Sequence, residues 1–165
     1  ELLTALKKLS TEKKFTLIFE KQAKTDLVKN GFDDKNLKRT FGGVEYIGYL
    51  KNINEFLRWV NVVIDLHIQN KFLTCASPPA KILEAMSSGT IVVSTNMPEI
   101  REIIENGKNG FLVNGNSSEE IYEKIKMALN SSKAGKNARK TILEKFNSDK
   151  LIIKYEKIYR ELIKK

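Results

Sequence analysis

The sequence has little of the residues on which metal sites and disulfides depend. Its 165 residues include one cysteine, Cys75, and one histidine, His67. A single cysteine excludes a disulfide within the chain and is typical of a reducing compartment. A structural zinc site needs four nitrogen or sulfur ligands, and no partner residues near His67 suggest a histidine-based catalytic centre. We therefore expect plain binding or chemistry that needs no metal.

Long hydrophobic runs are also missing. Hydrophobic residues make up 41% of the chain and charged residues 30%, as in a soluble globular protein. No apolar run approaches the roughly 20 residues of a membrane span, and no signal-peptide pattern is present. Because the chain begins at Glu1 and not at a methionine, we interpret it as a piece of a longer protein. The single cysteine predicts a cytoplasmic location, with a peripheral position on the inner face of the membrane as a further expectation.

The net charge of +9 is concentrated in the tail. Residues 133–165 carry 11 Lys/Arg against 4 Asp/Glu, whereas the preceding 132 residues carry 18 against 16. A basic tail can meet anionic lipid or nucleic acid, although charge runs on helices usually serve solubility. Aromatic residues interleaved with Lys/Arg are sparse, so we expect no nucleic-acid partner.

Short apolar runs alternate with helical patterns along residues 1–130. We expect strands at 15–19, 44–50, 62–66, 90–95 and 110–113, with helices between them. Continuous apolar strands separated by helices indicate a parallel sheet covered on both faces. The sequence therefore predicts an α/β, doubly wound, Rossmann-like domain over 1–130 and a helical tail over 131–165. Such sheets bind ligands beyond the carboxyl ends of their strands.

The stretch SPPAKILEAMSSG, residues 77–89, begins in one of those loops. Pro79 or Ala80 is a natural first helical residue, so unpaired N–H groups near Ala80 and Lys81 would face a phosphate. Lys81 stands at the amino end of the helix, where a positive charge opposes the helix dipole. This position is unfavourable unless an anion lies beside it. Glu84, one turn on, could accept hydrogen bonds from vicinal hydroxyls. The alternative is an ordinary i,i+3 surface pair between Lys81 and Glu84, and spacing alone leaves both interpretations open.

A longer block, KILEAMSSGTIVVSTNMPEIREIIENGKNGFLVNGNSSEEIYEKI, carries a family resemblance. It is similar to the carboxyl-terminal, nucleotide-sugar-binding domain of GT-B fold glycosyltransferases of family 4 (group 1). In that family a Leu-Glu-Ala-Met helix is followed by an apolar strand, a Glu-Ile-Ile helix, a Gly-x-Leu-Val strand and a capped helix. The similarity is dense over residues 77–125 and weaker elsewhere. It implies a retaining enzyme that moves a hexose from a nucleotide-diphosphate sugar to a glycan or lipid-linked acceptor, without metal or cofactor.

The resemblance also implies roles for individual residues. It puts Glu84 at the ribose hydroxyls and the turn around Tyr49 and Leu50 near the nucleobase, although both turn residues could instead cap the core. His67 is a candidate sugar contact, with a solvated loop histidine as the alternative. The diphosphate would be held by the loop that contains Ser77, Pro78, Pro79, Ala80 and Lys81.

Three departures from the family pattern limit what the chain can do. Ala76 stands where the family has a second glutamate near the donor sugar. It is therefore a candidate sugar contact that lacks the family's carboxylate. The family's first strand, with its glycine–arginine pair and following lysine, does not precede the first helix. The loop after Phe19 reads EKQAKTD, where Lys21 and Lys24 could offer charge in place of a glycine-rich turn. A departing diphosphate needs positive charge, and the amino-terminal domain that binds the acceptor is also missing. We therefore expect residues 1–165 to bind nucleotide weakly at most, without catalysing transfer.

These patterns leave three functions open. The first is the donor-binding half of a glycosyltransferase, whose last helix crosses to an amino-terminal acceptor-binding domain of the same parent chain and lies near an anionic membrane. The second is a nucleotide-sugar epimerase of the same fold. The third is a degenerate, non-catalytic GT-B module that binds a partner or a membrane.

Overall fold

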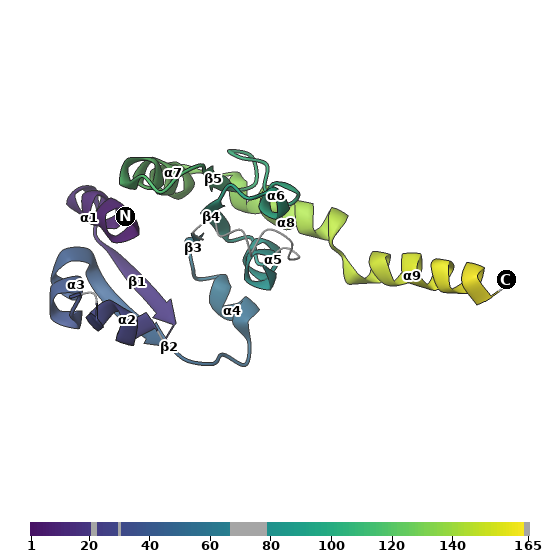
Figure 1. Cartoon of the computed structure of the whole chain (residues 1–165), viewed down its shortest axis with the longest axis horizontal. Helices are drawn as coiled ribbons and strands as arrows, with labels where there is room; N and C mark the ends of the chain where they lie inside the picture. The colour runs from purple at the N-terminus through teal and green to yellow at the C-terminus, as the bar shows by residue number, and fades with distance from the viewer. Residues whose placement is uncertain (21–22, 30, 67–78, 164–165) are drawn as a thin grey trace.

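The structure, a computed structural model, describes residues 1–20, 23–29, 31–66 and 79–163. Helices and strands alternate along most of this length (Figure 1), in the order α1 (Leu2–Glu12), β1 (Phe15–Glu20), α2 (Ala23–Lys29), α3 (Asp34–Phe41), β2 (Gly42–Ile47), α4 (Ile53–Leu57), β3 (Val62–Asp65), α5 (Ala80–Ser87), β4 (Ile91–Thr95), α6 (Pro98–Arg101), β5 (Phe111–Val113), α7 (Ser118–Asn130), α8 (Ala134–Lys145) and α9 (Ser148–Ile163).

Every strand pair among the described residues is parallel. β1 pairs with β2, with Phe15 opposite Gly42, and β4 lies between β3 and β5. This confirms the predicted α/β class with parallel strands. The hydrogen bonds nevertheless form two ladders, β1–β2 and β3–β4–β5, and within the described ranges no strand pairing joins one ladder to the other.

Helices cover both faces of the second ladder, as buried parallel strands require. On one face α1, α3 and α7 form a core cluster in which Leu6 and Ile121 pack with Val93. On the other face α4, α5, α6 and α8 form a second cluster that includes Ile82 and Val92. Val92 and Val93 belong to opposite clusters because successive side chains of a strand point to opposite faces.

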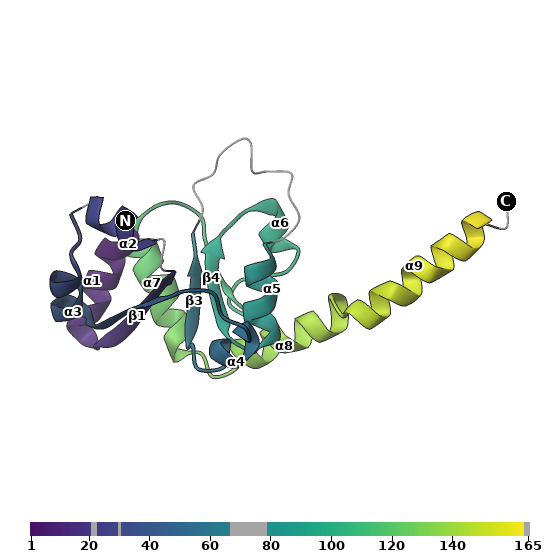
Figure 2. The ribbon, with the colours of Figure 1, turned by 90° about the horizontal axis from the view of Figure 1, so that it is seen from below.

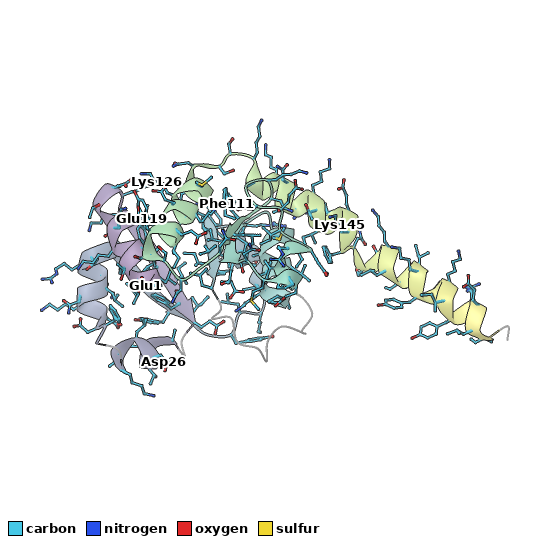
Figure 3. The ribbon with its side chains drawn as sticks, turned by 45° about the horizontal axis from the view of Figure 1, so that its top comes forward. Glu1, Asp26, Phe111, Glu119, Lys126 and Lys145 are labelled. Carbon is cyan, nitrogen blue, oxygen red and sulfur yellow. The ribbon has the colours of Figure 1, made fainter. Side chains whose placement is uncertain are left out.

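The contact between α1 and α7 connects the amino-terminal part of the chain to the second ladder (Figure 3). At one end of this interface, Lys8 Nζ lies 2.5 Å from a carboxylate oxygen of Glu119. At the other end, Lys126 Nζ lies 2.9 Å from a carboxylate oxygen of Glu12. The Tyr122 hydroxyl donates a hydrogen bond to the Glu12 carboxylate. This hydrogen bond, together with that from Lys126, holds the pKa of Glu12 below its ordinary value.

The tail divides into a packed helix and an exposed one. α8 buries Ala134, Ala138 and Ile142, and it approaches α5 so closely that a Cβ on Gly135 would overlap the Gly89 carbonyl. α9 has no buried residue and extends away from the body (Figures 1 and 2). Within the described part of the chain, no helix combines the length and the apolar character needed to cross a bilayer.

The elements differ from the predicted ones by more than a residue or so at two places in the part of the chain around α3 and β2. α3 was not predicted, because its sequence DKNLKRTF is mostly polar and buries only Leu37 and Phe41. β2 covers Gly42–Ile47, whereas the apolar run predicted a strand over 44–50. As a result, residues 48–50 lie beyond the end of the strand.

Candidate functional site

The carboxyl ends of β3 and β4 meet the amino end of α5. Asp65 is the last residue of β3, and its side chain is 8% exposed. The buried Ser94 hydroxyl of β4 donates a 2.9 Å hydrogen bond to the Asp65 carbonyl oxygen. This bond joins the two strand ends side by side, and the Asp65 carboxylate is left at the edge where parallel sheets bind ligands.

α5 begins without a side-chain cap. Pro79 is its N-cap residue and Ala80 its first helical residue, as the sequence predicted. The Pro79 carbonyl accepts hydrogen bonds from the Ile82 and Leu83 N–H groups. The N–H groups of Ala80 and Lys81 donate to no acceptor in the described ranges, and the first turn contains no acidic residue. Among the described residues, two backbone donors thus have no acceptor at a helix end that carries partial positive charge.

Lys81 is directed to the strand end and not along its own helix. Its Nζ lies 2.5 Å from Oδ1 of Asp65, and the Lys81 side chain is 54% exposed. The alternative pairing of Lys81 with Glu84 is therefore wrong. The nearby carboxylate also explains how a lysine is tolerated in the first turn, since Asp65 supplies negative charge against the helix dipole.

Glu84 lies one helical turn beyond Lys81 on the same side of α5. Its side chain is exposed and makes no hydrogen bond or ion pair that the described structure records; the Ser87 hydroxyl bonds only to the Glu84 backbone carbonyl. The carboxylate is therefore available to accept hydrogen bonds. Its role at a ribose stays a prediction.

The predicted base-binding turn is open to solvent. Tyr49 is 94% exposed, so the alternative in which it caps the core is wrong. Leu50 lines a shallow hollow of about 330 Å³ together with Asn52, Phe56 and Trp59. An exposed aromatic ring beside an apolar hollow could stack on a planar base.

Several predicted residues lie outside the described ranges, and others have partners already. The residues outside the described ranges are His67, Ala76, Ser77 and Pro78, and also Cys75 and Lys21.

Lys24 is described, and its Nζ lies 3.0 Å from the Asp34 carboxylate. Asp34 also accepts a 2.7 Å hydrogen bond from the Tyr46 hydroxyl. Burial, and then this hydrogen bond, raise the pKa of Tyr46 to about 12. Lys24 therefore helps to fix α2 against α3.

Two glutamates near the carboxyl ends of β4 and β5 were not predicted as site residues. Glu120 of α7 accepts hydrogen bonds from the N–H groups of Asn114 and Gly115, and these bonds, first that from Asn114, lower its pKa. It closes the loop after β5. Glu99 follows β4 in the first turn of α6, and its Oε2 is buried without a hydrogen-bond partner in the described structure. The Pro98-Glu99 pair after a strand was the signal in the sequence that could have pointed to this residue. The burial of the Glu99 carboxylate oxygen is visible only in the fold.

A larger hollow, of about 640 Å³, lies between the α6 region and α8. Its wall includes Arg101, Lys140, Glu144 and Lys145. The Lys140 Nζ lies 3.8 Å from Oε1 of Glu144. The charged groups of this wall are exposed and lie on surface helices. We therefore place the candidate site at Asp65, Lys81 and Glu84 and not in this hollow.

Comparison with known proteins agrees with this fold. The sequence profile of the family described as Glycosyl transferases group 1 matches residues 2–131. The chain belongs to the group 1 glycosyltransferases. Among curated proteins of this kind, the N-acetyl-alpha-D-glucosaminyl L-malate synthase of Bacillus anthracis is 26% identical over 125 residues. The match covers 73% of this chain and 31% of that enzyme.

Solved glycosyltransferase structures share the fold. HepE of Anabaena, determined in complex with UDP and glucose, superposes with a TM-score of 0.65 at 20% identity, covering 99% of this chain and 44% of that one. The C-terminal domain of the group 1 protein LpcC from Francisella tularensis gives a TM-score of 0.61 at 22% identity, covering 88% of this chain and 78% of that one. The chain therefore has the Rossmann-like fold of one half of a GT-B glycosyltransferase, and it spans less than half the length of HepE.

The ion pair at the strand end predicts a measurable stability effect. We expect Lys81→Met to lower the free energy of unfolding by about 1–2 kcal/mol, because a nearly buried carboxylate loses an ammonium group in direct contact. Lys108→Met is the matched control, since Lys108 and Glu105 form a pair in which both side chains are more than 60% exposed. That change should cost about 0.5 kcal/mol or less. Urea denaturation measures both variants, and equal losses would contradict the importance of the Asp65–Lys81 contact.

Proposed function

We propose that this group 1 glycosyltransferase chain is the donor-binding half of a retaining transferase. The full protein would move a hexose from a nucleotide-diphosphate sugar to a glycan or lipid-linked acceptor. The observation that carries the proposal is the amino end of α5, where the Lys81 ammonium and the Glu84 carboxylate lie on one side of the helix, beside N–H groups that have no acceptor among the described residues.

In this proposal the diphosphate binds at the first turn of α5. The N–H groups of Ala80 and Lys81 donate to phosphate oxygens, and the helix dipole favours the negative charge. The Lys81 ammonium turns from Asp65 toward the phosphate, or bridges the two anions. A diphosphate brings more negative charge than one carboxylate, so it competes for Lys81. Asp65 thus keeps the lysine at the strand end until a nucleotide arrives.

Glu84 would bind the ribose. A carboxylate accepts two hydrogen bonds from vicinal hydroxyls, and bonds to a charged acceptor contribute about 1.5–3 kcal/mol. Tyr49 and Leu50 would then contact the base, and the loop that contains His67 and Ala76 would contact the sugar. The structure of HepE with UDP and glucose supports a nucleotide-sugar donor for a protein of this fold.

A thermal-shift screen with uridine, guanosine and adenosine diphosphates tests the ribose assignment. A ligand that binds only the folded chain stabilises it by about 2.7 kcal/mol at a concentration 100 times its Kd. We expect one diphosphate to raise Tm by several degrees and Glu84→Ala to abolish that shift. The fold should tolerate the change, because Glu84 is exposed and alanine favours helices.

Glu123→Ala is the matched control for this experiment. Glu123 is an exposed glutamate on α7, away from α5, so the variant has the same change of charge and side-chain size. It should keep the full ligand-induced shift. An unchanged shift in Glu84→Ala, or an equal loss in both variants, would show that Glu84 does not bind the ribose.

The exposed helix α9 suggests how the chain meets the rest of its protein and its cellular surroundings. We propose that its apolar stripe, which includes Leu151, Tyr155, Ile158 and Leu162, packs against an amino-terminal acceptor-binding domain. Each of these side chains is at least 37% exposed here. Lys150 and Lys157, which lie to one side of this stripe on α9, would contact the anionic inner face of a membrane, which suits a cytoplasmic enzyme with a lipid-linked acceptor.

Liposome pelleting tests the membrane part of this proposal. Vesicles with anionic lipid should pellet the chain at low salt, and rising salt should release it, because each lysine near the surface contributes about 1 kcal/mol. Lys150→Glu/Lys157→Glu should weaken pelleting at least about tenfold. Lys133→Glu/Lys136→Glu makes the same charge change at the start of α8 and should have a smaller effect. Pelleting that ignores salt, or equal effects of both double variants, would exclude a lipid surface for α9.

A further inference from the structure

The Asp65 carboxylate lies beside the proposed diphosphate position and carries the sign of charge that opposes a phosphate. Its side chain is 8% exposed, and its Oδ1 lies 2.5 Å from Lys81 Nζ. We propose that Asp65 lowers the affinity of the site for diphosphates, because it competes with the ligand for the Lys81 ammonium. This role rests on the proposed function and adds a strand residue that regulates binding at the start of α5.

Of the two partners in this ion pair, Asp65 is the one held in place. Its carbonyl oxygen accepts a hydrogen bond from the Ser94 hydroxyl, and β3 pairs along its length with β4, whose residues are all buried (Figure 2). The Lys81 side chain is 54% exposed, and its four-carbon stem is flexible. Breaking the contact therefore requires a movement of the ammonium group, whereas the carboxylate keeps its position.

The Lys81 ammonium is within reach of both anions. Side chains of a helix are directed toward its amino end, so the Lys81 side chain extends toward the first turn of α5, which begins at Ala80. The carboxyl end of β3 lies there too, since Asp65 contacts Lys81. A phosphate held by the N–H groups of this turn would be a second anion beside one ammonium group. Because one positive charge cannot neutralise two anions, each anion weakens the attraction available to the other.

The affinity of the site depends strongly on whether this ammonium is available. Lys81 is the only basic residue of α5, whose sequence is AKILEAMS. While Lys81 contacts Asp65, the two opposite charges nearly cancel for a ligand at the helix start. An uncharged residue in place of Asp65 would leave one positive charge there, and the gain in attraction would grow with the negative charge of the ligand.

This competition has a consequence for product release. Once the hexose has moved to an acceptor, the nucleoside diphosphate that remains has a terminal phosphate with a second pKa of about 6. Near neutral pH it therefore carries more negative charge than the donor, in which the same phosphate is esterified to the sugar. A free lysine would retain the more highly charged product more tightly. Asp65 thus weakens product binding more than donor binding.

The test is an NMR titration of the 15N-labelled chain with methyl diphosphate, which has the charged groups of the product without base or sugar. The amide shifts of Ala80 and Lys81 report binding at α5. We expect Asp65→Asn, which removes the charge and keeps the side-chain size, to lower the Kd about tenfold or more. Symmetrical dimethyl diphosphate, in which both phosphates are esterified as in the donor, should gain only about threefold.

The fold should tolerate this substitution, because the Ser94 hydroxyl bonds to the backbone of residue 65 and not to its side chain. Asp65→Leu is a second uncharged variant, suited to a nearly buried position, and it gives the same expectation if the asparagine variant unfolds. Glu105→Gln is the matched control. It frees Lys108 from an exposed ion pair and changes the net charge by the same amount, and it should leave the Kd at Ala80 within about twofold of the original.

A double-mutant cycle shows whether Asp65 acts through the lysine. In a Lys81→Met background, Asp65→Asn should change the Kd by about twofold or less, because no ammonium is released. Equal gains in both backgrounds, equal gains for the two diphosphates, or a gain in Glu105→Gln as large as in Asp65→Asn would overturn the proposal. Binding of methyl diphosphate by the unmodified chain at Ala80 and Lys81, with an equal or higher Kd in Asp65→Asn, would contradict this inference alone. If neither form shows saturable shifts at these amides, the proposed diphosphate site fails together with it.

Discussion

The packing of α1 against α7 is the interaction on which the rest of the described structure depends. No described strand hydrogen bond connects β1–β2 to β3–β4–β5, so side chains keep the two ladders together on this face. Lys8 and Glu119 form one end of the contact, and Glu12, Tyr122 and Lys126 form the other. Apolar residues of both helices lie beneath these polar groups in one core cluster. Without this contact, α1 to β2 would be an isolated small unit with little core of its own.

The candidate site depends on the second ladder alone. β4 is buried along its whole length, and Ser94 connects its end to the end of β3. Asp65 is therefore held in place, and Lys81 follows it. This arrangement places a charged, partly exposed lysine at a helix start, beside backbone donors and one turn before Glu84. A site of this kind needs a rigid support for its polar groups, and the β3–β4–α5 unit supplies it.

Local patterns were enough to predict most of the fold. Apolar runs such as VVID and IVVST gave β3 and β4 because strands covered on both faces have continuous apolar sequences. α3 was missed because a short helix with only two buried residues has a weak periodic signal. Its N-cap, Asp33, which accepts a hydrogen bond from the Asn36 N–H, was the signal that could have revealed it. The separation into two ladders could not be predicted, because pairing between distant strands is a property of the assembled fold.

The start of α5 was predicted from the sequence, whereas the contact between Lys81 and Asp65 at that helix end was missed. The proline-flanked start of α5 followed from turn and capping preferences. The pairing of Lys81 with Asp65, 16 positions earlier in the chain, could not follow from spacing, which favoured Glu84 as the nearest partner on the same helix. The buried oxygen of Glu99 was likewise invisible, since burial depends on what packs around α6.

The most direct measurement of donor binding at α5 is an NMR titration of the 15N-labelled chain with nucleoside diphosphates. The largest changes in amide chemical shift should occur at Ala80 and Lys81, with smaller changes at Asp65 and Glu84. Changes concentrated instead around Arg101 and Lys140, in the hollow beside α8, or no saturable change with any nucleotide, would contradict binding at this helix end.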